Sequence, residues 1–399
     1  MEKFELIKKL RDSFTFQMSL GSKELFHTNF LEWLSIVDWN GFIDLMHTMA
    51  GLKNGEKFWW EDSNSPAKEN VEVRREFNHY DLSIYVEINE KWCPVLILEN
   101  KVKSMPYQEQ LNRYREKAFK EWKSCLLPRV RKKEVIEDRW KDKGVFFVLL
   151  TIFDETIVLP DSWKIFKYNS LKVELDRISN GITDTKQKLI IEDYCQFIGA
   201  LYNLANTNDW KVEPNDNYDC KIITDREEEI KLRIADLREK IIHERMLSLL
   251  IKKIESKNVF KEKHMHGDKN KESGNDNTGV VFYQTSFSRG KGITEAFVII
   301  NKDYRLMIQL QRNEYRRCLI LHKTNNESAK ERKQREARKT NIVTKLGKEL
   351  WHGYKPNRFF GDNFTYAFEP IDNRTMDEVL NKMVQDLSNI MECIRLNKI

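Results

Sequence analysis

Three side chains around one apolar run carry the strongest chemical signal in this sequence: Asp81, Glu99 and Lys101. The run Pro94–Leu98 has the pattern of a strand that is buried on both faces. Charged side chains at its end must reach a cleft or a partner, because an isolated buried charge is very costly. Side chains two apart on a strand share a face, so Glu99 and Lys101 point the same way.

A hairpin of 79–88 and 92–101, with its loop centred on Glu90, places Asp81 opposite Glu99. Directly opposed side chains lie about 5 Å apart at Cβ, and two carboxylates that close repel each other unless a cation lies between them. Two carboxylates, a backbone carbonyl and waters are ligands that suit Mg²⁺. This register predicts a magnesium site, whereas a shift by one residue would turn Asp81 towards the core.

The elements that must position these residues follow from hydrophobic spacing and from Gly and Pro. In the first half we expect a helical region at 1–52 that ends near Gly51, strands at 71–78, 80–88, 94–102 and 144–153, and helices from Pro106, at 169–179 and at 185–206. In the second half we expect a charged helix at 225–257, strands at 280–287, 295–301, 304–311 and 315–322, and a helix at 374–396. The sequence thus predicts an α/β domain at 1–206, a connector and long charged helix at 207–257, and an α+β accessory domain at 258–399.

Composition excludes several classes of protein. With 399 residues and 40% hydrophobic residues, the chain has enough apolar side chains for two or three globular domains and is not disordered. The net charge of +6 permits nucleic acid as a partner without requiring it. Six widely spaced cysteines without a zinc pattern favour a reducing, cytoplasmic environment, and we expect neither a secretory signal nor a membrane segment.

The arrangement of Asp81 and then Glu99-Asn100-Lys101 at the end of an apolar strand resembles the PD-(D/E)XK nuclease superfamily. Downstream, Gln110 and Tyr114 match the Q-x-x-x-Y helix of many members. The resemblance covers residues 1–206, and we recognise nothing in 207–399.

The segment 23–34 is similar to the N-terminal helix of one bacterial branch, in which a glutamate faces the metal site. Glu24 is the best match by position, and Glu32 is the second. The segments 163–178 and 190–204 are similar to the closing part of that branch. One departure is Tyr80, which occupies the position of the proline that gives the superfamily its name.

The resemblance implies a restriction-endonuclease-like mixed sheet flanked by helices, and Mg²⁺-dependent hydrolysis of phosphodiester bonds, with Mn²⁺ as a substitute. The implied metal ligands are Asp81, Glu99, the Asn100 carbonyl and Glu24. Lys101 would stabilise charge in the transition state, and Gln110 and Tyr114 would orient water, Lys101 or phosphate. On family grounds DNA is favoured over RNA, with a role in prokaryotic defence against phage or mobile DNA. The alternative is a catalytically silent module that binds nucleic acid or protein.

Simpler explanations compete with each assignment. The acidic pair and Lys101 would otherwise form a surface salt-bridge cluster, and Gln110, Tyr114 and Glu24 would be ordinary helix residues. His27 is expected to pack rather than act as a base. His264 and His266 suit a flexible polar loop better than a metal site, and Arg289–Gly292 suits a hairpin turn better than a phosphate loop.

A basic stretch at 323–348 is followed by Trp351, Tyr354, Phe359 and Phe360. Basic charge beside aromatic rings suits contact with phosphates and bases. A solvated helix followed by a core segment explains the same pattern. Residues 207–399 therefore remain open to substrate recognition, to regulation by a protein partner, or to assembly of a homo-oligomer.

Overall fold

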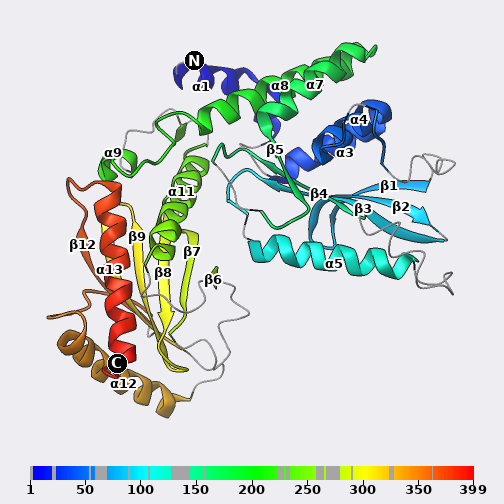
Figure 1. Ribbon diagram of the computed structural model, residues 1–399. Helices are drawn as coiled ribbons and strands as arrows, with labels where there is room; N and C mark the ends of the chain where they lie inside the picture. The colour runs from blue at the N-terminus through cyan, green and yellow to red at the C-terminus, as the bar shows by residue number, and fades with distance from the viewer. Residues whose placement is uncertain are drawn as a thin grey trace. The chain divides into compact units, whose positions relative to one another are not determined.

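The computed structural model divides the chain into two compact units (Figure 1). The first unit comprises residues 1–207 and 228–234, and the second comprises 208–227 and 235–399. The structure describes residues 3–19, 24–53, 55–58, 70–88, 90–106, 108–126, 144–155, 159–222, 229–230, 234–257, 265–266, 279–288, 291–322, 328–361 and 363–399. The chain is a mixed α/β protein with two sheets, and this part of the predicted fold class is confirmed.

Helices open the first unit, as their apolar spacing predicts. They are α1 (Lys3–Asp12), α2 (Phe14–Met18), α3 (Glu24–Val37) and α4 (Trp39–Ala50). The Asp38 side chain caps α4 by accepting a hydrogen bond from the Gly41 amide. Gly51 ends α4 at φ 74°, a left-handed conformation that glycine adopts without strain.

A five-stranded mixed sheet in the order β1-β2-β3-β4-β5 forms the centre of the first unit. Its strands are β1 (Val71–Phe77), β2 (Tyr80–Ile88), β3 (Lys91–Lys101), β4 (Phe146–Thr151) and β5 (Trp163–Lys167). The first three pair antiparallel, whereas β4 runs parallel to both β3 and β5. Strand β5 was not predicted, because five residues with two lysines carry little strand signal.

The β2–β3 hairpin has the register that the sequence predicts at its open end. Leu82 pairs with Leu98 and Ile84 pairs with Leu96. Continuing this register by one residue sets Asp81 against Glu99. An irregularity between Ile84 and Tyr85 shifts the pairing only towards the loop. Asp81 and Glu99 therefore lie on the same face of the sheet, at the end of the hairpin opposite its loop.

Helices cover both faces of this sheet (Figure 1). Helix α5 (Gln108–Leu126) packs on one face through Leu111, Ala118 and Trp122, which join Ile97 and Phe147 in one core cluster. Helices α3 and α4 pack on the other face. Helices α7 (Tyr168–Gly181) and α8 (Thr185–Ala205) pack against each other, and α8 also contacts α1.

The second unit is built on a seven-stranded sheet in the order β11-β12-β10-β9-β8-β7-β6. Its strands are β6 (Met265–His266), β7 (Val281–Ser288), β8 (Lys291–Ile299), β9 (Tyr304–Gln311), β10 (Glu314–Leu321), β11 (Arg358–Phe360) and β12 (Phe364–Pro370). Its helices are α9 (Tyr218–Ile222), α11 (Ala235–Glu255), α12 (Ala329–Glu349) and α13 (Met376–Arg395). All its strand pairs are antiparallel except β6 with β7.

Helix α11 lies within the charged helix predicted at 225–257 and belongs to the second unit. It contacts β7, β8 and α13, and it buries apolar side chains such as Ile241 and Leu247. Its charged residues include buried ones, among them Arg238 and Glu244. The high charge of this segment therefore does not mark a solvated linker, because several of its charges lie inside the second unit.

Candidate functional site

The open end of the β2–β3 hairpin brings the predicted charged residues together. The Asn100 amide donates a hydrogen bond to Asp81 Oδ2 at 2.6 Å. Two residues apart on β3, Lys101 Nζ lies 2.6 Å from Glu99 Oε1. The Glu99 side chain is almost completely buried, and Lys101 is only slightly more exposed. The structure thus places two carboxylates and one ammonium group on neighbouring strands with little contact with water.

Helix α5 adds the two residues of the predicted Q-x-x-x-Y pattern. Gln110 Nε2 donates to Glu99 Oε1 at 2.9 Å and to the Tyr114 hydroxyl at 3.0 Å. Residues four apart on a helix lie on one face, so a single amide can reach both partners. The packing of Leu111 on the sheet fixes the position of this face.

Helix α3 contributes Glu24 to the same end of β3. Glu24 Oε1 accepts hydrogen bonds from the amides of Val102 at 3.1 Å and Lys103 at 3.0 Å. Its backbone carbonyl accepts a bond from Asn100 Nδ2 at 3.0 Å. Glu24 therefore ties the chain that leaves β3 to α3, and one of its carboxylate oxygens is already used in this way.

Tyr168, the first residue of α7, is a part of the site that sequence reasoning missed. Its hydroxyl donates to Asn100 Oδ1 at 2.7 Å, and both side chains are fully buried. Three groups of Asn100 are therefore hydrogen-bonded: its backbone N–H, its side-chain Nδ2 and its side-chain Oδ1. The position of Tyr168 directly after a short strand was the only available signal, and that strand was not predicted.

Burial and like charge dominate the electrostatics of this cluster. Burial, followed by the neighbouring charge of Glu99, raises the pKa of Asp81 to about 8. Burial also raises the pKa of Glu99, although Lys101 opposes the shift. Burial alone would lower the pKa of Lys101, but the carboxylates of Glu99 and Glu24 outweigh it and raise that pKa. Asp81, Glu99 and Glu24 thus surround the single ammonium group of Lys101, and the raised pKa values mean that ionising both Asp81 and Glu99 is unfavourable here.

Two observations bear on whether these residues suit a divalent cation. Among the residues that the structure describes, no hydrogen-bond partner reaches the buried Glu99 Oε2, and Asp81 lies close enough for mutual repulsion. Both features fit a cation bound through carboxylate oxygens. Across the described residues, no group of three or more His, Cys, Asp or Glu is placed to hold a metal ion. A cation here would thus depend on two carboxylates, with backbone carbonyl and water oxygens completing its shell.

Other residues singled out in the sequence lie apart from this cluster. Glu32 forms an ion pair with Arg75, 2.5 Å apart, so it serves α3–β1 packing. His27 packs as expected: it is fully buried and its Nδ1 lies 2.9 Å from the Tyr194 hydroxyl. Burial, then the charge of Lys103, lowers the pKa of His27 to about 3, which suits a neutral core residue.

Several expectations concern residues that are wholly or partly outside the described parts of the chain. His264 lies outside them, and only the backbone of His266 is described, in β6. Residues 289 and 290 also lie outside them, but Ser288 pairs with Lys291 in the antiparallel β7–β8 ladder. That pairing agrees with a hairpin at this position.

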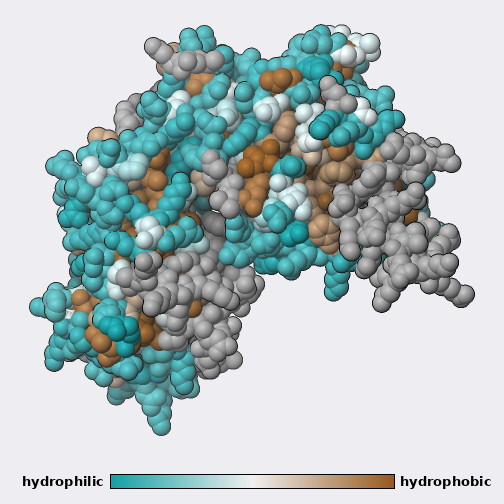
Figure 2. Space-filling model, in the orientation of Figure 1, coloured by the Kyte–Doolittle hydropathy of each residue, from teal (hydrophilic) through white to brown (hydrophobic). Residues whose placement is uncertain are grey.

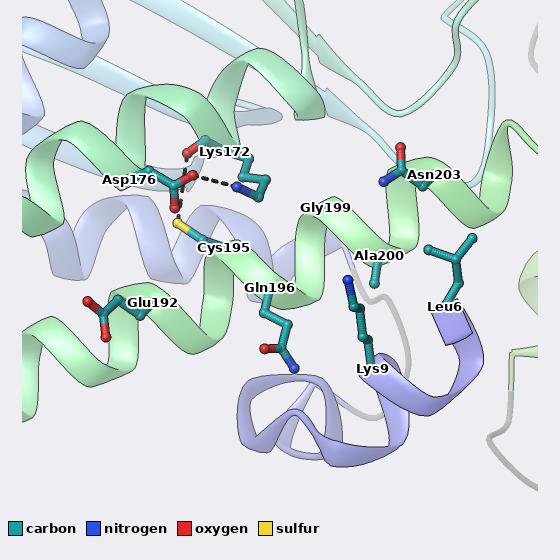
Figure 3. Close-up of a pocket in the computed structure, with 10 residues that line it drawn as sticks. All are labelled: Leu6, Lys9, Lys172, Asp176, Glu192, Cys195, Gln196, Gly199, Ala200 and Asn203. Atoms are coloured by element: carbon teal, nitrogen blue, oxygen red, sulfur yellow. Dashed lines mark hydrogen bonds and ion pairs between the residues drawn. The ribbon is translucent and has the colours of Figure 1, made fainter. Parts of the chain in front are cut away.

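A cavity of about 310 Å³ lies elsewhere in the first unit, between α1, α7 and α8 (Figure 3). Its lining includes Lys172, Asp176 and Cys195. Lys172 and Asp176 form an ion pair with each other, and burial raises the pKa of the Cys195 thiol beyond the range of a reactive thiolate. No residue of the Asp81 cluster lines this cavity, and we assign it no role.

Comparison with known proteins gives no assignment. No protein-family model matches the sequence, and neither the curated proteins nor the solved structures contain a match. Within the described part of the chain, no helix has both the length and the apolar character that crossing a bilayer requires. A functional proposal must therefore be built from the geometry of the residues.

Proposed function

We propose that this protein is a metal-dependent nuclease of the PD-(D/E)XK type, which hydrolyses phosphodiester bonds in nucleic acid. The observation that carries the proposal is the meeting of Asp81, Glu99 and Lys101 at one end of a hairpin, with Gln110 bonded to Glu99. The three segments that supply these residues were singled out from the sequence by one motif pattern. A surface salt-bridge cluster would not require them to be buried together.

The fold of the first unit supports a restriction-endonuclease-like assignment. An antiparallel hairpin is followed by two parallel strands, and helices cover both faces of the sheet. The proposed site lies where β3 ends beside α3 and α5, so three elements converge on it. Rigid elements of this kind hold catalytic groups in fixed positions.

Each side chain of the site has a separate chemical role in this proposal. Asp81 and Glu99 would hold Mg²⁺ or Mn²⁺, which lowers the pKa of bound water and neutralises charge on a phosphate. Lys101 presents an ammonium group where negative charge increases in the transition state. Gln110 fixes Glu99 and is itself fixed by Tyr114. Glu24 and the Asn100 side chain hold the end of β3 in place.

Nucleic acid is the substrate class proposed here, and DNA is favoured over RNA through the family resemblance. The same resemblance suggests a role in prokaryotic defence against phage or mobile DNA, which is an argument by analogy. The alternative is a silent binding module on a nuclease scaffold. The intact set of Asp81, Glu99 and Lys101 favours catalysis, because a pure binder has no need for a buried and repelling acidic pair.

Cleavage assays test this proposal directly. The purified full chain should cut plasmid DNA, single-stranded DNA or RNA with Mg²⁺ or Mn²⁺ and should not cut in EDTA. Lys101→Ala should lower the rate by about 100- to 1000-fold, with an unchanged circular dichroism spectrum. Lys123→Ala removes an exposed lysine from α5 and should stay within about twofold of the parent rate. Activity that persists in both Lys101→Ala and Asp81→Asn would remove this site from consideration.

Direct metal binding separates a nuclease that awaits activation from a silent module. Mn²⁺ binding by calorimetry should show a site in the parent chain that Asp81→Asn abolishes. A chain that binds nucleic acid but neither binds Mn²⁺ at this site nor cuts any substrate would be the binding module.

A further inference from the structure

Helix α12 of the second unit exposes nearly all of its length. Its 21 residues include eight Lys or Arg and three Glu, and only Arg335 and Leu346 are buried. By contrast, the 20-residue helix α13 buries nine residues along one face. Packing therefore does not account for the basic character of α12. One of its three acids, Glu331, is engaged in the N-terminal capping box with Ser328.

Strand β11 places two large aromatic side chains in solvent beside this helix. Phe359 and Phe360 are 62% and 61% exposed, and β11 is the outermost strand of the sheet. Trp351 and Tyr354, which are nearby in the sequence, are buried. The basic stretch is thus followed by a core segment, as one interpretation predicted, and then by an exposed aromatic pair that this interpretation does not explain.

Lys339 of the basic helix and Phe359 form one surface, whereas Arg358 and Phe360, the neighbours of Phe359 on β11, point to the opposite face of the sheet. Lys339 Nζ lies 5.2 Å from the centre of the Phe359 ring, which is a cation–π contact. Arg358 places its guanidinium 5.4 Å from the centre of the Phe368 ring on the adjacent strand. Figure 2 shows this end of the second unit as mostly hydrophilic, with hydrophobic side chains visible in between.

A cavity of about 310 Å³ adjoins the other side of α12. Arg335, Arg338 and Lys345 of the helix line it, together with Tyr304 and His322 of the sheet end. Arg338 also forms an ion pair with Asp303, 3.2 Å apart. Three helix cations thus line this cavity, together with Asp303 and the C-terminal residue Ile399.

Strand pairing places this cavity and the aromatic pair at the same end of the sheet. Tyr304 pairs with Leu321, whose amide donates to the Asn363 carbonyl, and Phe364 pairs with Phe360. Neighbouring strands are about 4.8 Å apart, so β10 and β11 are separated by about 10 Å across β12. That spacing is within reach of two successive nucleotides.

We propose that α12 and β11 form a binding surface for single-stranded nucleic acid, in which Arg338, Lys339 and Lys345 contact phosphates and Phe359 stacks on an unpaired base. Cations attract the phosphate backbone, and exposed rings need base faces that a duplex conceals. This inference goes beyond the proposed hydrolysis and does not depend on it, because the surface uses no residue of the Asp81 cluster.

Fluorescence anisotropy on the full chain tests the surface without cleavage. The probes are a labelled 20-nucleotide oligo(dT), the matching oligo(U) and a 20-base-pair duplex, all in EDTA and in the Lys101→Ala background. The parent should bind at least one single strand several-fold more tightly than the duplex. Phe359→Ala should weaken single-strand binding about tenfold or more, with little change in salt dependence, whereas Phe360→Ala should have a smaller effect.

Charge removal should have a different signature. Arg338→Ala/Lys339→Ala should weaken binding and reduce the slope of log K against log salt by about 1.4, which corresponds to two phosphate contacts on a single strand. Lys252→Ala is the matched control. Lys252 is an exposed residue near the end of α11, where its neighbour Lys253 bonds Asp377 at the start of α13. Near the other end of α13, Cys393 bonds Glu349, the last residue of α12. The length of α13 between these two contacts separates the control from this end of α12 by about 25 Å.

Three results would overturn the inference. The first is single-strand binding that is unchanged both in Phe359→Ala and in Arg338→Ala/Lys339→Ala. The second is a preference for the duplex that Phe359→Ala does not change, which would indicate charge attraction alone. The third is no oligonucleotide binding but Phe-dependent binding to phosphatidylserine vesicles, or Phe-dependent self-association on gel filtration. Cleavage that persists in both Lys101→Ala and Asp81→Asn, with intact anisotropy, would refute the nuclease site alone, so the two proposals fail separately.

Discussion

Each unit of this protein has a buried carboxylate beside its sheet, and the two carboxylates differ in how completely they are hydrogen-bonded. In the second unit, Asp386 of α13 receives hydrogen bonds from Tyr315 at 2.7 Å and from Arg317 at 2.8 and 3.2 Å, so both of its oxygens are paired. In the first unit, Glu99 has Lys101 and Gln110 on Oε1, and none of the described side chains or amides pairs with its Oε2.

Under the proposed function, this difference separates a structural carboxylate from one that would hold a ligand. A buried charge with every lone pair satisfied stabilises the fold around it, whereas an unsatisfied one destabilises the fold until a ligand arrives. Asp81 and Glu99 also repel each other, because burial and the charge of Glu99 raise the pKa of Asp81 to about 8. Functional sites characteristically combine burial with like charge in this way.

The largest effect we expect is a difference in stability between two variants, each of which removes one carboxylate charge from one unit. Asp386→Asn leaves Arg317 without its ionic partner and should lower the opening free energy of α13 and β10 by about 2–4 kcal/mol. Asp81→Asn, in EDTA at pH 8, removes a repelling charge and keeps an oxygen for the Asn100 amide. It should leave β2 and β3 as stable as in the parent or more so.

Hydrogen exchange measured by mass spectrometry resolves the two units separately, which a global melt would not. The comparison breaks if Asp81→Asn accelerates exchange in β2 and β3 while Asp386→Asn leaves α13 unchanged. In that case Asp81 would be the structural carboxylate.

Strand alternation and one hairpin register were enough to predict that Asp81 and Glu99 face each other. The sequence did not reveal Tyr168 as a partner of Asn100, because that contact depends on how the chain returns after β5. It also did not reveal that Glu24 caps the end of β3 through its carboxylate. Periodicity specifies which face a side chain occupies, but contacts between distant elements depend on packing.

The Asp386–Arg317 pair was missed for a related reason. The two residues are 69 positions apart, and a charged residue on the inner face of an amphipathic helix has no signature of its own. The exposed charges of α12 and the buried charges of α11 likewise look alike in the sequence. Only the structure shows that α11 packs its charges inside the second unit while α12 leaves most of them in solvent.

An intermediate effect concerns His27, whose buried ring links α3 to α8 in the first unit. Burial and Lys103 lower the pKa of His27 to about 3, so the folded chain holds the imidazole neutral. Its stabilising contribution is complete above pH 6.5, the ordinary pKa, and decreases by about 1.4 kcal/mol per pH unit as pH falls towards 3. At pH 5 the loss is about 2 kcal/mol.

Hydrogen exchange of α3 and α8 at pH 7 and pH 5, corrected for intrinsic rates, measures this loss. His27→Gln keeps a polar group near Tyr194 without titrating, so its α3 and α8 peptides should show a smaller difference between the two pH values. His352→Gln, at an exposed position of the second unit, should behave like the parent. Equal pH sensitivity in the parent and His27→Gln would assign the effect to another group.

The smallest effect is stabilisation of the first unit by a divalent cation, and it is the most direct test of the unsatisfied oxygen on Glu99. A cation that binds only the folded chain, at ten times its dissociation constant, stabilises by about 1.4 kcal/mol. The opening free energy of β2 and β3, measured by hydrogen exchange, should then rise by the same amount. Asp81→Asn should abolish this stabilisation by the cation. Glu295→Gln alters a buried carboxylate that Gln284 and Gln309 already satisfy, and should retain it. An equal rise in both variants would mean that Mg²⁺ acts elsewhere on the chain, and the distinction between the two buried carboxylates would then concern stability alone.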